Sequence, residues 1–313
     1  MRPGKHPIEW LAVRPTSSEI LARPARFVTL FLIDWTVIAV AALLWSVYPR
    51  WWIAPAIALV VGARQHGLAV LMHETVHQRA LTRIMGWICA WSLLISWASF
   101  RCNHLAHHRW VHTENDPDLQ FKLQARPEDW RFPMSTARLV ALFSKDLAGY
   151  GVVSNLRRLR RYRGASDVHS PDLNASPDPV AWRITFTVTF VVLWVAVIGW
   201  RGFLAAWVLP LFTTLPWMLR VRSVAEHFNL PTGLAEPTRV VRASWFEREF
   251  LGFGPHMIGY HAPHHLFPGV CCHNLKALDY RLQNNEGYNA GFKSADGYFL
   301  GRDSVFNQLR YAP

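Results

Sequence analysis

The feature that most restricts the fold is a nearly uncharged stretch, residues 27–48, in which Asp34 is the only charged residue. A helix of this length spans about 33 Å, enough to cross the hydrocarbon core of a bilayer. Tryptophans lie near the ends of several apolar stretches, as is typical of membrane–water interfaces. The later apolar stretches are 51–63, 84–100, 184–200 and 203–219. The sequence therefore predicts a multi-pass helical membrane protein.

Composition and charge placement agree with this interpretation. Charged residues make up only 17% of the chain and apolar residues 51%, which argues against a disordered chain and against an ordinary soluble enzyme. The net charge of +12 suggests nucleic acid at first, but its placement favours a membrane. If 49–51 and 201–202 are outer turns, all 33 Lys and Arg except Arg50 and Arg201 fall on one side, which is the positive-inside pattern. We therefore expect no nucleic-acid partner, and we interpret the basic cluster at 157–163 as a topology signal.

The histidines form three clusters with helical spacing. In a chain with 15 His, one H-x-x-H-H pattern is expected by chance only about 0.03 times, and two are present. Side chains three or four positions apart share a helix face, so each cluster directs two or three imidazoles toward one point. Imidazole is a ligand of Zn, Cu, Fe and Ni. The clusters are His73 and His77; His104, His107 and His108; and His261, His264 and His265.

A shared metal centre restricts the topology, because its ligands must lie on one side of the membrane. The stretch 84–100 is then expected not to cross but to be re-entrant or interfacial, and 184–219 to be a two-pass hairpin. The predicted fold class is an all-α membrane protein with four transmembrane helices, formed as a single domain over 1–313. The first hairpin covers 27–71, and a helical cap facing the cytoplasm is built from 64–83, 101–180 and 220–313.

The motifs together resemble the membrane fatty acid desaturase/hydroxylase superfamily. H-x-x-x-H at 73–77 is similar to its first histidine box, and HLAHHRWVHTENDPDL (104–119) to its second. YHAPHHLFPGVCCHNLKAL (260–278) resembles the third box, and Glu226-His227 resembles a segment that supplies an extra ligand. The resemblance covers roughly residues 27–300.

The resemblance implies a non-haem di-iron enzyme that uses O₂ and two electrons to introduce a cis double bond into a fatty acyl lipid. The implied iron ligands are His73, His77, His104, His107, His108, His227, His261, His264 and His265. Candidates for groups that orient these ligands are Glu74, Asp116, Asp118, Glu226, His112 and Ser223. Ser223 stands where related chains often carry an Asn that holds a metal-bound water. An acyl tunnel lined by residues such as Trp and Phe is expected to run from the cap into the helix bundle.

The expected partners are a membrane lipid or acyl substrate and a separate electron donor, a ferredoxin or another electron-transfer protein. A separate donor is expected because the chain lacks the His-Pro-Gly-Gly signature of a fused haem domain. One alternative within the superfamily is a hydroxylase or ketolase acting on an alkyl chain or carotenoid. Two remote alternatives are an intramembrane zinc protease, since 73–77 also reads H-E-x-x-H, and a metal transporter or sensor.

Overall fold

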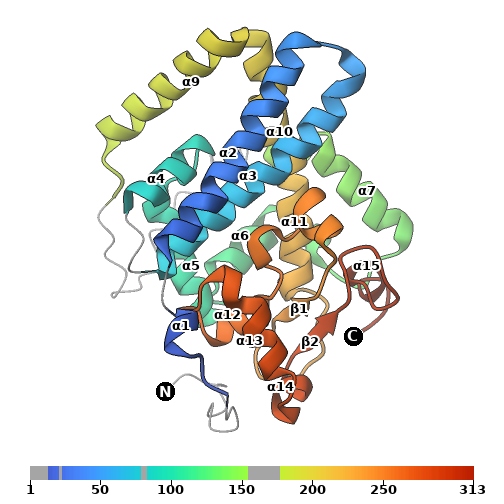
Figure 1. Ribbon diagram of the computed structural model, residues 1–313. Coiled ribbons are helices and arrows are strands. Elements are labelled where there is room, and N and C mark those ends of the chain that lie inside the picture. Colours follow the sequence, from blue (N-terminus) through green and yellow to red (C-terminus); the bar gives the residue numbers. More distant parts are fainter. Residues whose placement is uncertain (1–12, 21–22, 79–82, 154–176) are drawn as a thin grey trace.

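The computed structural model of the chain describes residues 13–20, 23–78, 83–153 and 177–313 and is mostly helical (Figure 1). The basic cluster predicted at 157–163 lies outside the described residues. The helices are α1 (Ser17–Ile20), α2 (Pro24–Val47), α3 (Ala54–His77), α4 (Arg83–Ser92), α5 (Trp97–Trp110), α6 (Pro117–Ala125), α7 (Thr136–Leu147), α9 (Val180–Phe203), α10 (Leu209–Phe212), α11 (Thr214–His227), α12 (His261–Leu266), α13 (Leu275–Leu282), α14 (Glu286–Gly291) and α15 (Val305–Gln308). The strands are β1 (Arg239–Val241) and β2 (Lys293–Ala295).

Three helical segments are long and apolar enough to cross a membrane: Pro24–Val47, Trp51–His77 and Val180–His227. The count rises to four if the bent pair α4 and α5 is taken as one span. The predictions of a mostly helical chain and of several candidate membrane spans are confirmed. The first segment begins three residues before the predicted stretch because Pro24 occupies the first turn of α2, where its missing N–H costs no hydrogen bond.

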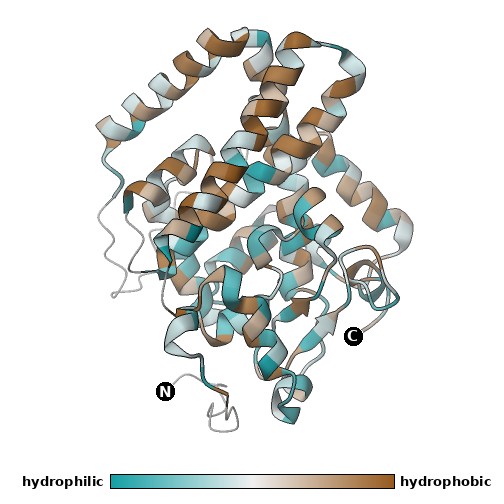
Figure 2. Cartoon of the chain, viewed as in Figure 1, coloured by the Kyte–Doolittle hydropathy of each residue, from teal (hydrophilic) through white to brown (hydrophobic). Residues whose placement is uncertain are grey.

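The apolar segments divide into an outer and an inner layer. None of the most apolar window of Val180–His227 is buried, and on α2 and α9 large side chains such as Val40 and Val197 are 60% and 71% exposed. The corresponding window of Trp51–His77 is 67% buried, so α3 is the central helix. Figure 2 shows brown, apolar ribbon over α2, α3 and α9 and more teal in the half that holds α12 to α14. Exposed apolar faces of this extent mark the surface that lipid would cover.

The segment 180–227 folds back on itself at Gly199. Its φ of 72° and ψ of 165° break the helix, in a region of backbone conformation that favours glycine. The ring of Trp207 lies 5.0 Å from Phe190 and 5.4 Å from Trp194. In a straight helix, residues 17 positions apart would be separated by about 25 Å. The chain therefore reverses after Gly199: Leu204–Val208 packs back on α9, and α10 and α11 continue away from it (Figure 1).

The stretch 84–100 is not one straight helix. The axes of α4 and α5 differ by 102°, and Leu94 in the turn between them has a φ of 61°. The carboxylate of Asp178 fixes the turn by accepting the backbone N–H groups of Trp97, at 2.9 Å, and Ala98, at 3.1 Å. An acid at this place satisfies free N–H groups of the first turn of α5. Whether the bent pair enters the membrane stays a prediction.

Two features stabilise the C-terminal part of the chain, which contains the third histidine box. The strands β1 and β2 pair in parallel over three residues, with Val240 opposite Ser294, a small addition to the predicted all-α fold. The buried guanidinium of Arg239 donates to the carbonyl oxygens of Phe228, at 3.2 Å, and Asn229, at 3.1 Å. These bonds occupy carbonyls just past the end of α11, the helix that ends at His227.

A buried ionic cluster joins α2, α3 and the loop before α12. Asp34 is fully buried and lies 3.1 Å from Nη1 of Arg64 and 2.8 Å from Nε2 of His256. Gly67 makes this approach possible, because a Cβ there would lie 2.4 Å from an Asp34 carboxylate oxygen. The single charge of the predicted first apolar stretch is thus paired inside the protein, as buried charges in membrane helices usually are.

Candidate metal centre

Nine histidines, the same nine that the sequence resemblance names as ligands, converge in two groups. Within each group, one possible ligand atom from every residue lies within 4.8 Å of the others. The first group consists of His73, His77, His104, His108 and His264. The second consists of His107, His227, His261 and His265. The elements α3, α5, α11 and α12 supply all nine side chains.

The two H-x-x-H-H boxes divide between the groups in opposite ways. On α5, the pair four residues apart, His104 and His108, enters the first group, and His107 enters the second. On α12, the pair His261 and His265 enters the second group, and the middle histidine of that box enters the first. Residues four apart lie on one helix face, and the third is rotated toward the neighbouring group. Each box therefore spans two adjacent centres.

The ring nitrogens of the first group point at one another. Nε2 of His104 lies 2.8 Å from Nε2 of His77 and 3.0 Å from Nε2 of His108. Nε2 of His264 lies 3.1 Å from that of His108. Nitrogens that bind one ion at about 2.1 Å with right angles between them are about 3 Å apart, so this spacing matches a coordination sphere.

The second group has the same geometry and lies beside the first. Nε2 of His227 lies 3.2 Å from Nε2 of His107 and 2.9 Å from Nε2 of His261. The two groups touch where the rings of His108 and His265 stack, with centroids 4.2 Å apart. Two ions held in these groups would be neighbours.

Several imidazoles of the second group are oriented from behind by oxygen atoms. Nδ1 of His107 lies 2.9 Å from Oδ2 of Asp116, and Nδ1 of His265 lies 2.8 Å from Oε1 of Glu236. Nδ1 of His227 lies 3.0 Å from the carbonyl oxygen of Pro237. An Nδ1–H that donates to such an oxygen leaves Nε2 as the free lone pair, which is the arrangement found behind metal-bound histidines.

The other candidates for orienting groups have different contacts. Asp118 forms an ion pair with Lys122, one turn further along α6. Glu226 accepts a hydrogen bond from Arg222 at 2.6 Å and lies 3.4 Å from Nδ1 of His261. The ring of His112 packs on Phe228, and its backbone N–H donates to Asp116.

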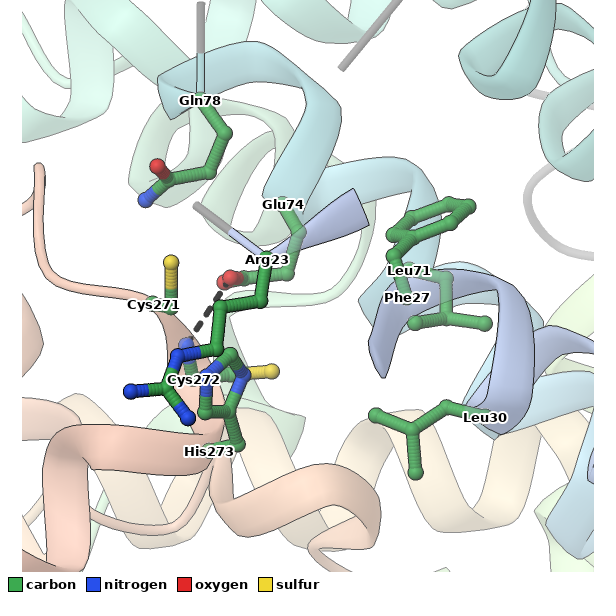
Figure 3. A pocket seen from close by; sticks show the side chains of 9 residues that line it. All are labelled: Arg23, Phe27, Leu30, Leu71, Glu74, Gln78, Cys271, Cys272 and His273. Carbon is green, nitrogen blue, oxygen red and sulfur yellow. Dashed lines mark hydrogen bonds between the residues drawn. The ribbon is translucent and has the colours of Figure 1, made fainter. Parts of the chain in front are cut away.

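Glu74 lines a small pocket that none of the nine histidines borders. Its carboxylate accepts a hydrogen bond from the backbone N–H of Cys272 at 2.9 Å, and Arg23 and His273 line the same pocket (Figure 3). Its distance from Nδ1 of His73 is 3.7 Å, too long for a hydrogen bond. The pocket has a volume of about 20 Å³, room for one water molecule. Glu74 thus ties α3 to the segment that follows the third box.

Glu236 and Pro237 are site residues that the sequence does not reveal. They lie in a Pro- and Gly-containing loop between α11 and β1, and Glu236 is 29 positions from the histidine it contacts. No helical period links the two residues, so their contact depends on tertiary packing alone. The general rule that an acid orients a metal-bound histidine predicts that such a residue exists, but it does not say which acid in the sequence it is.

The residues present fit metal ions. Nε2 of His73 and Nε2 of His265 are buried and have no hydrogen-bond partner among the described residues. A buried ring nitrogen without a partner is costly unless an ion or a water binds it. Burial and the neighbouring histidines lower the pKa of His264 and His265 well below the usual 6.5, so both stay neutral at pH 7. Neutral imidazole is the form that binds metals.

Both histidine groups border one cavity of about 670 Å³. Of the nine histidines, those that line it are His73, His104, His107, His227 and His261. One part of the wall is apolar and is made by Leu93, Leu94, Ile95, Phe100, Leu211, Phe212, Leu215 and Leu219. The other part carries charges from Asp118, Lys122, Arg126, Asp129, Lys145, Asp146, Arg220, Arg222 and Glu226. The aromatic lining expected from the sequence is present but is only part of the wall.

Comparisons with known proteins agree on one family. The sequence model of the fatty acid desaturase family matches residues 49–292 of this chain. A curated relative, dihydrorhizobitoxine desaturase of Bradyrhizobium elkanii, is 28% identical over 302 residues, which cover 88% of this chain and 82% of the relative. The matched region contains every histidine of both groups.

Proposed function

The chain belongs to the fatty acid desaturase family, and from that premise we propose that it is an O₂-dependent di-iron desaturase held in a membrane. The observation that supports the iron pair most directly is the convergence of nine histidines in two adjacent groups. With iron bound, the pair supplies, together with O₂ and two electrons, the power to remove hydrogen from an unactivated C–H bond. The balanced reaction converts –CH₂–CH₂–, O₂, two electrons and two protons into –CH=CH– and two waters.

The chain's own residues would hold the irons and direct the substrate. The Nε2 atoms of each group face inward, and Asp116 and Glu236 keep His107 and His265 in one tautomer. The cavity wall positions the substrate beside both groups, so the carbons that react are chosen by placement rather than by side-chain chemistry. This division of labour is general for enzymes whose metal carries the difficult step.

We propose an acyl lipid as the first substrate to test, since the apolar part of the cavity wall is suited to an alkyl chain. The electrons would come from a separate ferredoxin or other electron-transfer protein. A hydroxylase or ketolase remains the alternative, because removal of a second hydrogen and transfer of oxygen to carbon can begin from the same site.

The proposed topology has the histidine groups facing the cytoplasm. Its support is the placement of the basic residues, of which only Arg50 and Arg201 fall in the two outer turns. With α9 across the membrane, the fold-back at Gly199 would return the chain to the side from which α9 starts. Crossings by α2, α3, α9 and the α10–α11 arm would give four passes, with the bent α4–α5 pair kept on the inner side.

The contacts of Glu74 argue against the protease alternative. In an H-E-x-x-H protease, the glutamate acts as general base next to one zinc ion. Here the Glu74 carboxylate is buried against the backbone N–H of Cys272. His73 and His77 also lie in a group with three more histidines, which leaves less room for a water-bound catalytic zinc.

The test is a lipid profile of cells that express the chain, measured by gas chromatography and mass spectrometry, together with iron analysis of the purified protein. We expect about two irons per chain and a new unsaturated acyl species that requires O₂. His264→Ala should lose the product and iron, whereas His273→Ala, a change outside both groups, should keep both. A hydroxylated product would replace the desaturase assignment with a hydroxylase. A zinc-loaded chain, or full activity of His264→Ala, would overturn the proposal.

A further inference from the structure

The charged part of the cavity wall gives information about the substrate. The acids there already have partners: the two carboxylate oxygens of Asp146 both accept from Arg220, and Asp118 pairs with Lys122. Arg126 lies 3.4 Å from Asp129. Each ion pair neutralises one acid and one base. An N–H of the base that takes no part in the pair can still donate a hydrogen bond to a ligand.

Unused donors do face this part of the cavity. Nη1 of Arg220, Nη1 of Arg126 and Oγ of Ser223 are buried and have no hydrogen-bond partner among the described residues. All three residues line the same cavity. Lys145 also lines it and makes no ion pair with any residue that the structure describes. The wall therefore offers hydrogen-bond donors and one extra positive charge, while its acids are occupied.

Aromatic rings hold the cations in place. The guanidinium of Arg220 lies 4.6 Å from the ring centre of Trp130, and the ammonium of Lys122 lies 5.3 Å from it. Arg126 lies 4.9 Å from the ring of Tyr150. Contacts of this kind are favourable by about 0.5–1 kcal/mol at exposed sites and by about 2 kcal/mol when desolvated, so they restrict the positions of the cations before a ligand arrives. Fixed donors bind a planar anion with a small entropy loss.

The same helix connects this cluster to the metal groups. On α11, Arg220 and His227 are seven residues apart, so they share a face and are separated by about 10 Å along the axis. Ser223 lies between them on the cavity wall. A ligand held at Arg220 would reach His227 after about two helical turns.

We propose that the substrate of this site carries a free carboxylate, which binds to Arg220 and Arg126 with help from Ser223 and Lys145. The inference rests on the proposed desaturase function and departs from its acyl-lipid substrate: the alkyl chain would belong to a free acid that is not esterified to a carrier. The reacting carbons then lie about 10 Å from the carboxylate, the distance set by α11. The neutral carbonyl of a thioester or ester would accept weaker hydrogen bonds from the Nη1 donors than a carboxylate does.

The test compares decanoate with methyl decanoate, which have the same chain and differ in the charge. Binding is measured by calorimetry on the purified full chain in detergent, so the result does not depend on turnover. We expect decanoate to bind at least tenfold more tightly. Arg220→Gln should remove this preference, and Arg302→Gln, a change at an exposed arginine outside the cavity, should keep it.

A second variant guards against misfolding, because Arg220→Gln leaves the buried Asp146 without its partner. The double change Arg220→Gln with Asp146→Asn removes the whole pair and should show the same loss of preference. Equal affinities for acid and ester would overturn the inference, as would tighter binding of decanoyl-CoA that does not depend on Arg220. Two irons per chain with no carboxylate preference would overturn only this inference, whereas absence of iron would overturn the proposed function.

Discussion

The carboxylate of Asp116 lies 2.9 Å from Nδ1 of His107, and the same oxygen accepts the backbone N–H of His112 at 2.8 Å. Its other oxygen accepts the backbone N–H groups of Asp118 and Leu119 and so caps the start of α6. One side chain therefore joins the second histidine box to the helix that follows it. Burial of Asp116 keeps water out of these bonds.

Asp116→Asn separates these two roles. The amide oxygen still caps α6, but the NH₂ group in place of Oδ2 cannot accept from His107 or from the backbone N–H of His112, and the negative charge is gone, so the imidazole becomes a weaker ligand. We expect iron affinity to fall about 10- to 100-fold, and thermal stability to fall less than in Asp116→Ala, because the cap of α6 is kept. Asp116→Ala should lose both properties. Iron content by plasma mass spectrometry and thermal unfolding in detergent check the two effects, and unchanged iron in Asp116→Asn would contradict the role given to the charge.

Glu236 provides a second test of ligand orientation, at a residue far from any box. Its carboxylate lies 2.8 Å from Nδ1 of His265, so Glu236→Ala leaves that N–H without its acceptor. We expect a chelator to remove iron about 10- to 100-fold faster from the variant than from the wild type. The measurement is the rate of iron transfer to a coloured chelator. Glu128→Ala, at an exposed acid outside the groups, is the control. Equal rates in the wild type and Glu236→Ala would show that the contact does not affect the metal.

The part of the site that follows helical spacing was predictable, and the part that depends on folding between distant segments was not. His73 and His77 are grouped because residues four apart share a face of α3, and the same rule applies to α5 and α12. The split of each H-x-x-H-H box between two groups depends on how α5 and α12 pack. Glu236 contacts His265 from an irregular loop, where no regular spacing in the sequence indicates which residues meet. The membrane helices were predictable because a long uncharged stretch has few other stable environments.

The cavity shows the same limit. Sequence suggested a tunnel lined by aromatic residues, but α6, α7, α11 and the turn that follows α6 together bring nine charged side chains to its wall. These residues are scattered between 118 and 226, and each on its own resembles an ordinary exposed charge. Only the fold shows that Arg220 and Arg126 face one space.

Gly67 is expected to tolerate no side chain. A Cβ there would lie 2.4 Å from Oδ2 of Asp34, inside the cluster that also binds Arg64 and His256. Alanine is favoured over glycine in a helix by about 1 kcal/mol, but overpacking costs about 1–3 kcal/mol, and displacing a buried ion pair adds to this. We therefore expect Gly67→Ala to lower the thermal midpoint in detergent. Gly269→Ala, where a Cβ meets nothing within 4 Å, should leave it unchanged, and an unchanged or higher midpoint for Gly67→Ala would refute the packing argument.

The proposed topology places Arg50 and Arg201 on the side opposite Arg109, because the first two lie in the outer turns and the third lies on α5 beside the second histidine box. Single cysteines at these three positions, in a background from which the four native cysteines have been removed, test this with a thiol reagent that does not cross membranes. In intact cells, we expect label at Arg50→Cys and Arg201→Cys and none at Arg109→Cys until the membrane is opened. Label at Arg109→Cys in intact cells would place the second box outside and would require the bent α4–α5 pair to cross. Nε2 of His77 lies 2.8 Å from Nε2 of His104, so the first and second boxes must lie on the same side of the membrane. The label at Arg109→Cys therefore reports the side of both boxes.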